Sequence, residues 1–292
     1  MTRLMIGPLP RAHLKFQCPL IKRQEFRLTL VTRDPIWSAA GARAGLEFIG
    51  VDIERLGKTE RQIGIKNARI NDHELSSLDV VAKAAPGVPL FARLNPLHTG
   101  TSVEIEEALR RGVSALMLPQ FKNAAPLHEF FGMVAGRARV IPLLEDVAAM
   151  DHLDEILDLC VNDELMFGIN DFSRSLGLKH PMSMALHPDM ETVARAAKAK
   201  GVPFGWGGIA SPDPRPDLPI QPDDLLARYI DLDSDAAWLA RSLVDYSRPE
   251  DLPENVAKVR DRIDYWRAAG SDALAAARER LASQLGAIGI TY

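Results

Sequence analysis

The sequence predicts a (β/α)8 TIM barrel with an N-terminal arm and extra C-terminal helices. Eight runs rich in Ile, Val and Leu alternate with stretches of helical apolar spacing, at roughly 25–35 residues per unit. Each run is continuously apolar, as expected for parallel strands that are buried on both faces. The alternative, a doubly wound open sheet, is disfavoured because no G-x-G-x-x-G motif follows the first strand.

The strands are predicted from the apolar runs and the helices from apolar residues at a period of about 3.6. In chain order the strands span 27–33, 46–54, 88–95, 113–119, 139–145, 164–171, 202–208 and 236–244. Stop signals support the helix ends, such as Gly45 after the first helix and Pro86-Gly87 after the second. The helices span 34–45, 72–87, 101–112, 125–136, 148–160, 189–201 and 223–232.

Three regions are predicted along the chain. Residues 1–26 form an arm without periodicity, 27–250 form the catalytic barrel, and 251–292 form C-terminal helices with a break at Gly270. The first of these helices has an apolar face, which we expect to pack on the barrel or on a neighbouring subunit. That face carries Val256, Val259, Ile263 and Trp266.

Composition narrows the class of protein. The chain has 292 residues, 47% hydrophobic and 25% charged, with a net charge of −4, which is typical of a globular protein. The absence of a basic stripe disfavours nucleic acid as a partner. No apolar stretch is long enough to predict a membrane span, and Pro8 and Pro10 interrupt any signal peptide. Cys18 and Cys160 lack metal-ligand spacing, and they favour a cytoplasmic protein with reduced thiols.

Polar residues end several of the predicted strands. Because barrel chemistry gathers at the C-terminal ends of the strands, these residues are the candidate site. We interpret some as catalytic, namely Asp52, Glu54, Arg55 and Arg93, with Asn95 close by. We interpret others as substrate-binding, namely Arg93, Pro119, Gln120, Gly168 and Asn170.

Glu145 and Asp171 end two adjacent predicted strands, so their carboxylates are expected to converge. Two like charges in one confined place repel unless a proton or a cation lies between them. Mg²⁺ or Mn²⁺ is usually held by one or two carboxylates, with water and substrate oxygens completing the shell. We therefore predict a site for Mg²⁺, Mn²⁺ or another divalent metal. The alternative is that each acid caps the following helix.

Arg93 follows the apolar residues of the predicted strand 88–95 and is expected to point into the open end of the barrel. Its planar guanidinium suits the carboxylate of an oxo acid or an enolate oxygen. A structural ion pair with Asp52 or Glu54 is an equally good interpretation of the spacing.

Other features have two interpretations each. The glycine-rich stretch 204–210 is either a phosphate-binding loop or a place of tight packing, and packing is slightly preferred. Trp206 either stacks on substrate or lies in the core. His98 either faces the mouth from the loop after the third strand or is a solvated loop residue, and the second interpretation is preferred. The proline-rich segment 211–224 is predicted to be a stiff loop at the rim.

Taken together, these segments resemble the HpcH/HpaI aldolase and citrate lyase β-subunit family of metal-dependent barrels. The resemblance covers most of residues 27–244. It rests on the order and spacing of AGLEFIGVDIERLGKTERQ, FARLN, ALRRGVSALMLPQFKN, PLLED and FGINDFSRSLG.

The resemblance implies a divalent metal held by Glu145 and Asp171, and an arginine, Arg93, that grips pyruvate or enolate oxygens. It implies reversible carbon–carbon cleavage of a small oxo or hydroxy acid through a metal-stabilised enolate. It also implies a homo-oligomer, a trimer or hexamer, in which the last helix reaches a neighbour. A metal beside the developing oxyanion, together with Arg93, lowers the barrier electrostatically.

The chain departs from the pyruvate aldolases of this family at Arg55. Those enzymes carry a histidine for proton transfer in a D-x-E-H arrangement, whereas this chain reads Asp52-Ile53-Glu54-Arg55. A guanidinium is a poor general base, so Glu54 or Asp52 is the nearest substitute. Two alternatives stay open: a citrate- or malyl-CoA-type thioester lyase or thioesterase, and a catalytically silent barrel retained as a binding subunit.

Overall fold

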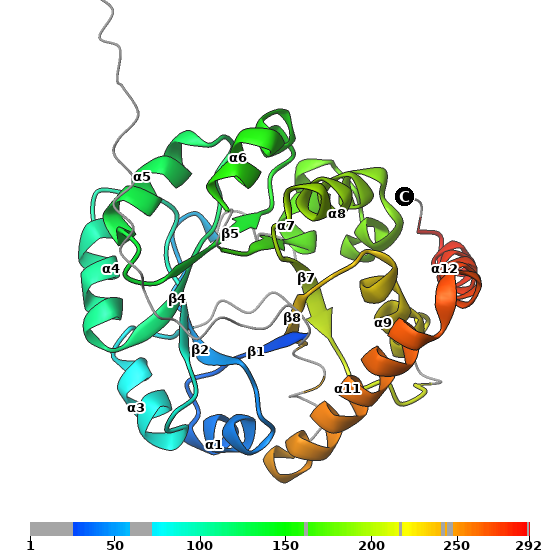
Figure 1. Cartoon of the computed structure of the whole chain (residues 1–292), viewed down its shortest axis with the longest axis horizontal. Helices are drawn as coiled ribbons and strands as arrows, with labels where there is room; N and C mark the ends of the chain where they lie inside the picture. The colour runs from blue at the N-terminus through cyan, green and yellow to red at the C-terminus, as the bar shows by residue number, and fades with distance from the viewer. Residues whose placement is uncertain are drawn as a thin grey trace, which may run out of the picture.

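The computed structural model is a closed barrel of eight parallel strands, each hydrogen-bonded to its neighbour in the order β1 to β8 (Figure 1). The strands are β1 (Arg27–Val31), β2 (Phe48–Asp52), β3 (Leu90–Arg93), β4 (Val113–Leu118), β5 (Arg139–Leu144), β6 (Leu165–Phe167), β7 (Phe204–Ile209) and β8 (Ala236–Leu239). The predicted (β/α)8 fold is confirmed. The structure describes residues 26–58, 72–160, 163–215, 218–240, 243, 248–290 and 292.

Helices surround the barrel as an outer ring (Figure 1). The α-helices of the ring are α1 (Pro35–Arg43), α3 (Ser77–Ala84), α4 (Thr101–Arg110), α5 (Ala125–Val134), α6 (Leu153–Leu159), α7 (Ile169–Ser175), α8 (Pro188–Lys200) and α9 (Pro222–Asp231). Short 3₁₀ helices are η1 (Val147–His152), η2 (Pro181–Leu186) and η3 (Pro249–Asp251).

Two apolar layers explain why the strands are continuously hydrophobic. The interior of the barrel is filled by one small buried cluster that includes Phe48, Phe91, Met117 and Met166. A much larger cluster lies between the strands and the helices. Successive residues of each strand therefore point alternately into the barrel interior and toward the helices, and both surroundings are apolar. This is the packing expected of a TIM barrel.

The predicted strand 164–171 is wrong at its C-terminal end. β6 stops at Phe167, and α7 begins at Ile169, so Asn170 and Asp171 lie in the first turn of a helix. Apolar runs of this length do not separate strand from helix. The helix forms here because Ile169 and Phe172 are one turn apart and both are buried.

The C-terminal helices pack on the barrel's outer ring. α11 (Leu252–Ala268) lies against α9 and α1, and α12 (Gly270–Ala287) lies against α9. The four apolar residues predicted to form one face of α11 are buried there. The break falls at Gly270, whose φ of +80° suits a residue without a Cβ. The arm 1–25, with Cys18, lies outside the described residues, and Cys160 is a buried free thiol.

No helix among the residues that the structure describes is both long and apolar enough to cross a membrane.

Carboxylates satisfy backbone N–H groups at the N-terminal end of the barrel. Three acids lie one or two residues before a strand. Each accepts a hydrogen bond from a backbone N–H at the start of the neighbouring strand. The pairs are Glu47 with Leu28 N (2.7 Å), Asp163 with Val140 N (2.7 Å) and Asp235 with Phe204 N (3.0 Å). These bonds stabilise the N-terminal end of the barrel, because a buried backbone N–H group without a partner is costly.

Asp163 makes the stability of this end of the barrel depend on pH. Burial, with a smaller contribution from Glu164, raises the pKa of Asp163 to about 6, although the Val140 amide and Arg139 act in the opposite direction. Because the pKa of Asp163 is higher in the folded protein than in the unfolded chain, it is the protonated carboxyl that favours folding. Its contribution to stability is complete below the unfolded pKa of 3.8 and is lost as pH rises through about 6. The ionised carboxylate is therefore destabilising at pH 8.

We expect Asp163→Asn to raise the free energy of unfolding at pH 8 by about 2–3 kcal/mol and to change it little at pH 4. Asparagine keeps an oxygen acceptor for the Val140 amide and removes the cost of ionisation. Urea unfolding followed by circular dichroism at both pH values measures the difference. A loss of stability at pH 8 would contradict the prediction.

Candidate functional site

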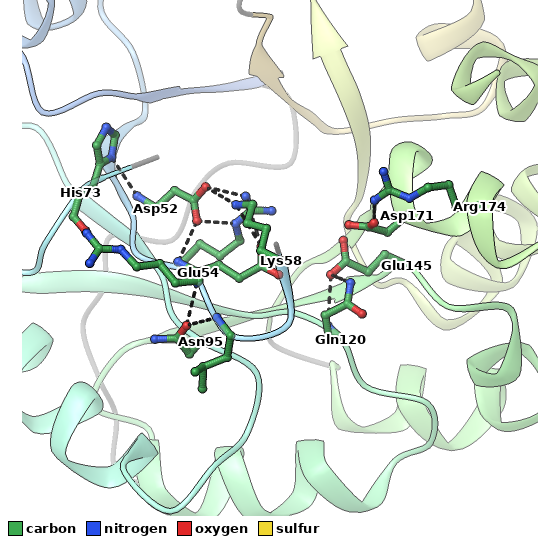
Figure 2. A network of polar contacts seen from close by, with 12 residues as sticks. Asp52, Glu54, Lys58, His73, Asn95, Gln120, Glu145, Asp171 and Arg174 are labelled. Carbon is green, nitrogen blue, oxygen red and sulfur yellow. Dashed lines mark hydrogen bonds and ion pairs between the residues drawn. The ribbon is translucent and has the colours of Figure 1, made fainter. Parts of the chain in front are cut away.

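The candidate site lies at the C-terminal mouth of the barrel, meaning the end where the strands finish. Asp52 ends β2 and Arg93 ends β3, and the parallel register sets these two residues side by side. Glu145 follows β5 directly, and Asp171 follows β6 through the first turn of α7. The strand ends therefore bring one group of polar residues to each side of the mouth (Figure 2).

Asp52 and Arg93 form a buried, two-pronged ion pair. Arg93 Nε donates to Asp52 Oδ1 at 2.8 Å, and Nη2 donates to Oδ2 at 2.6 Å. Asp52 is completely buried. Burial alone would raise the pKa of Asp52, but Arg93 and then Lys58 hold that pKa well below its usual range. The carboxylate is thus a permanent anion that orients the guanidinium.

Lys58 and Glu54 complete a four-charge cluster with Asp52 and Arg93. Figure 2 shows Asp52, Glu54 and Lys58 together on one side of the mouth. Lys58 Nζ lies 3.0 Å from Asp52 Oδ2 and 3.3 Å from Glu54 Oε2, and Arg93 Nη2 lies 3.4 Å from Glu54 Oε2. Lys58 is only 6% exposed. Lys58 is not among the residues predicted from the sequence, although its spacing of four residues from Glu54 is a usable signal.

Arg93 also interacts with residues on the other sides of the mouth. Its guanidinium carbon lies 5.2 Å from the centroid of the Trp238 ring, which comes from β8. Burial would lower the pKa of Arg93, but Asp52, then Glu54 and Glu145, raise it above its ordinary value. Glu145 therefore lies close enough to act on Arg93, and the two sides of the mouth are electrostatically connected.

Arg55 lies apart from the four-charge cluster. Its side chain is exposed, and Nη2 donates to the carbonyl of His73 at 3.0 Å. Its backbone N–H and that of Leu56 both donate to Asn95 Oδ1, at 2.8 and 3.1 Å. Asn95 therefore anchors the segment that carries Glu54 and Lys58, whereas the Arg55 guanidinium donates to the carbonyl of His73.

His73 supports the other end of that segment. The backbone N–H of Asp52 donates to His73 Nδ1 at 3.2 Å, so this nitrogen is an acceptor. Burial, and to a smaller extent Arg33 and Lys58, lowers the pKa of His73 against the opposing influence of Asp52. A neutral imidazole is consistent with both observations.

Glu145 is held by Gln120, which follows β4. The backbone N–H of Gln120 donates to Glu145 Oε1 at 3.1 Å, and its side-chain Nε2 donates to the same oxygen at 2.7 Å. Gln120 was predicted to bind substrate, but in the structure its amide holds this carboxylate. Glu145 is only 4% exposed.

Gly168 and Asp171 lie on the other side of Glu145. A Cβ at Gly168 would lie 2.9 Å from Glu145 Oε2, so this close approach requires glycine. Asp171 pairs with Arg174 one turn along α7. Figure 2 shows the carboxylates of Glu145 and Asp171 facing one another, and we call them the carboxylate pair.

Several other predicted features take a structural role. Trp206 is buried and stacks on Tyr229 at 4.1 Å between ring centroids, so it is a core residue. A Cβ at Gly205 would lie 2.4 Å from Met166 Sδ, so the glycine-rich stretch begins with tight packing. His98 is partly buried with Nε2 3.1 Å from Glu104, rather than solvated.

The last two predicted substrate-binding residues differ in exposure. Pro119 is buried beside Gln120, and Asn170 is exposed, with its carbonyl accepting from the Ser173 hydroxyl at 3.0 Å. Of the proline-rich segment 211–224, residues 216–217 lie outside the described residues, and Pro222 begins α9.

The carboxylate pair has the chemistry of a site for a hard divalent ion. Carboxylate oxygens are the ligands of Mg²⁺ and Mn²⁺, which accept one or two protein ligands and fill the other positions with water or substrate. Among the described residues, no group of three or more His, Cys, Asp or Glu side chains could hold a metal. Zinc sites usually take three or four protein ligands, so this donor set fits Mg²⁺ or Mn²⁺ better.

The fold and these side chains define a (β/α)8-barrel protein with an acidic pair and a paired arginine at its C-terminal mouth. Solved structures with the same fold include the HpcH/HpaI aldolase from Desulfitobacterium hafniense DCB-2, which is 18% identical with a TM-score of 0.56. That match covers 77% of this chain and 90% of the other.

Two further structures share the fold. An HpcH/HpaI aldolase/citrate lyase family protein from Burkholderia cenocepacia J2315 is 16% identical with a TM-score of 0.58, covering 80% of this chain and 96% of that one. Citrate synthase SbnG is 17% identical with a TM-score of 0.52, covering 82% and 95%. The chain therefore has the fold of HpcH/HpaI aldolase and citrate lyase family proteins. No family model and no curated protein matches the sequence.

Proposed function

We propose that this protein is a divalent-metal-dependent carbon–carbon lyase of the aldolase type, acting on a small 2-oxo or hydroxy acid. The observation that carries the proposal is the carboxylate pair, whose two carboxylates face one another on one side of the mouth, with Arg93 within electrostatic reach of Glu145. The shared fold with HpcH/HpaI aldolase and citrate lyase family structures supports the same class of reaction.

Glu145 and Asp171 would hold the metal. Mg²⁺ or Mn²⁺ in this position would supply a Lewis acid that stabilises negative charge on a substrate oxygen. Arg93 is already oriented by Asp52, so its guanidinium meets an incoming oxyanion or carboxylate with little reorganisation. Burial of this cluster strengthens each of these charge interactions relative to water.

In this proposal Glu54 accepts the proton and Lys58 is the neighbouring donor. Asp52 is a weak base because its pKa is held well below the ordinary range. Arg55 donates to the carbonyl of His73, and a guanidinium is a poor general base. Glu54 is therefore the remaining carboxylate of the four-charge cluster, and the Lys58 ammonium, 3.3 Å away, is the neighbouring proton donor.

The test is the exchange of pyruvate methyl protons in D₂O, followed by proton NMR. We expect exchange by the full-length protein to stop after treatment with EDTA and to return with Mg²⁺ or Mn²⁺. Metal without protein is the control. Exchange that survives complete metal removal would overturn the proposal.

Two other outcomes point to different functions. Cleavage of a coenzyme A thioester without exchange of free pyruvate would indicate a thioester lyase or thioesterase. Mn²⁺ binding without exchange or cleavage of either class would indicate a binding barrel.

A further inference from the structure

The conformation of Gln120 is unusual for the end of a barrel strand. Its φ is +58°, in the left-handed region that non-glycine residues rarely adopt. Such a conformation is strained for a residue with a Cβ and persists where the surroundings enforce it. Here Pro119 and Phe121 are both buried and hold the backbone on either side.

This conformation lets one residue donate twice to one oxygen. The backbone N–H and the side-chain Nε2 of Gln120 both reach Glu145 Oε1, at 3.1 and 2.7 Å. Two donors on one carboxylate oxygen restrict rotation of the carboxylate more than either donor would alone.

Glu145 is also confined on its opposite side. Gly168 lies against the Cβ and Oε2 of Glu145, and α7 begins immediately after Gly168. Oε2 is consequently directed toward the side of the mouth where Asp171 lies (Figure 2).

We propose that Gln120 is a positioning residue that orients Glu145 for metal binding by fixing Oε1 and turning Oε2 toward Asp171. This inference rests on the proposed function, because it assigns Glu145 as a metal ligand. It differs from the interpretation of Gln120 as a substrate contact, because a substrate contact has no effect on metal binding in the absence of substrate. Loss of a residue that orients a ligand typically weakens metal binding 10–100-fold.

The test measures Mn²⁺ binding to the full-length protein without substrate, by electron paramagnetic resonance of free Mn²⁺. Gln120→Ala and Gln120→Gly are each expected to raise the Mn²⁺ dissociation constant about 10–100-fold. Gln284→Ala is the matched control, because Gln284 donates its amide to the buried Asp224 at 2.7 Å on the outer ring. Its Mn²⁺ affinity is expected to equal that of the wild type.

Thermal unfolding of the metal-free variants separates positioning from folding. Glycine adopts a positive φ without a Cβ penalty, so Gln120→Gly is expected to be more stable than Gln120→Ala while binding Mn²⁺ equally poorly. Wild-type affinity in Gln120→Gly would overturn the inference, because the side-chain amide would then be dispensable. Failure of the wild type itself to bind Mn²⁺ would overturn the proposed function as well.

Discussion

Replacing Asp52 with alanine is expected to lower the free energy of unfolding by about 3–5 kcal/mol, because the change leaves buried cations without their main partner. Asp52 is fully buried and accepts hydrogen bonds from both Arg93 and Lys58. Glu54, at 3.3–3.4 Å from the two cations, is the remaining acid of the four-charge cluster. Urea unfolding at pH 7, followed by circular dichroism, measures the loss.

Two controls test whether the loss comes from unpaired buried charge. Asp72→Ala removes the exposed ion pair with Arg33 and is expected to have no measurable effect, because exposed pairs contribute little. The double variant Asp52→Ala/Arg93→Met removes one stranded cation and is expected to recover part of the stability. An Asp52→Ala loss no larger than that of Asp72→Ala would contradict the assignment of a buried, coupled pair.

Glu145→Gln and Asp171→Asn are each expected to reduce metal-dependent exchange of pyruvate protons by at least about 100-fold. Each substitution removes a negative charge and an anionic oxygen from the carboxylate pair while keeping the side chain's size. The measurement is the initial rate of exchange by NMR at saturating Mg²⁺ or Mn²⁺.

Glu129→Gln is the matched control, because Glu129 is an exposed acid on α5, on the outer ring. It is expected to exchange at the wild-type rate. Circular dichroism melting of all three variants shows whether folding is intact. Wild-type exchange rates in both folded site variants would refute the metal-ligand roles of Glu145 and Asp171.

Prediction from sequence was most successful for the barrel. Parallel strands that are covered on both faces must be apolar along their whole length, so Ile, Val and Leu runs at a regular spacing specify eight such strands. The convergence of the strand ends follows from this topology, which is why the sequence predicts Asp52, Arg93 and Glu145 at the same end of the barrel.

Prediction failed where the chain leaves the strands. Phe167-Gly168-Ile169 reads as one apolar strand, but the chain turns at Gly168 and begins α7, which places Asp171 on a helix. Arg55 directly follows Glu54, yet its side chain is exposed and donates to the carbonyl of His73, while its backbone N–H donates to Asn95. Lys58, further along the same segment, enters the cluster instead.

The sequence by itself determined the architecture of this protein and the residue types available at the mouth of its barrel, because hydrophobic periodicity and strand-end position are local properties of the chain. Only the tertiary structure decided which partner each charge takes. Arg93 pairs with Asp52, and Gln120 turns to hold Glu145, because contacts between strands depend on register and backbone conformation. Those distances across the barrel are not encoded in the spacing of residues along a single strand.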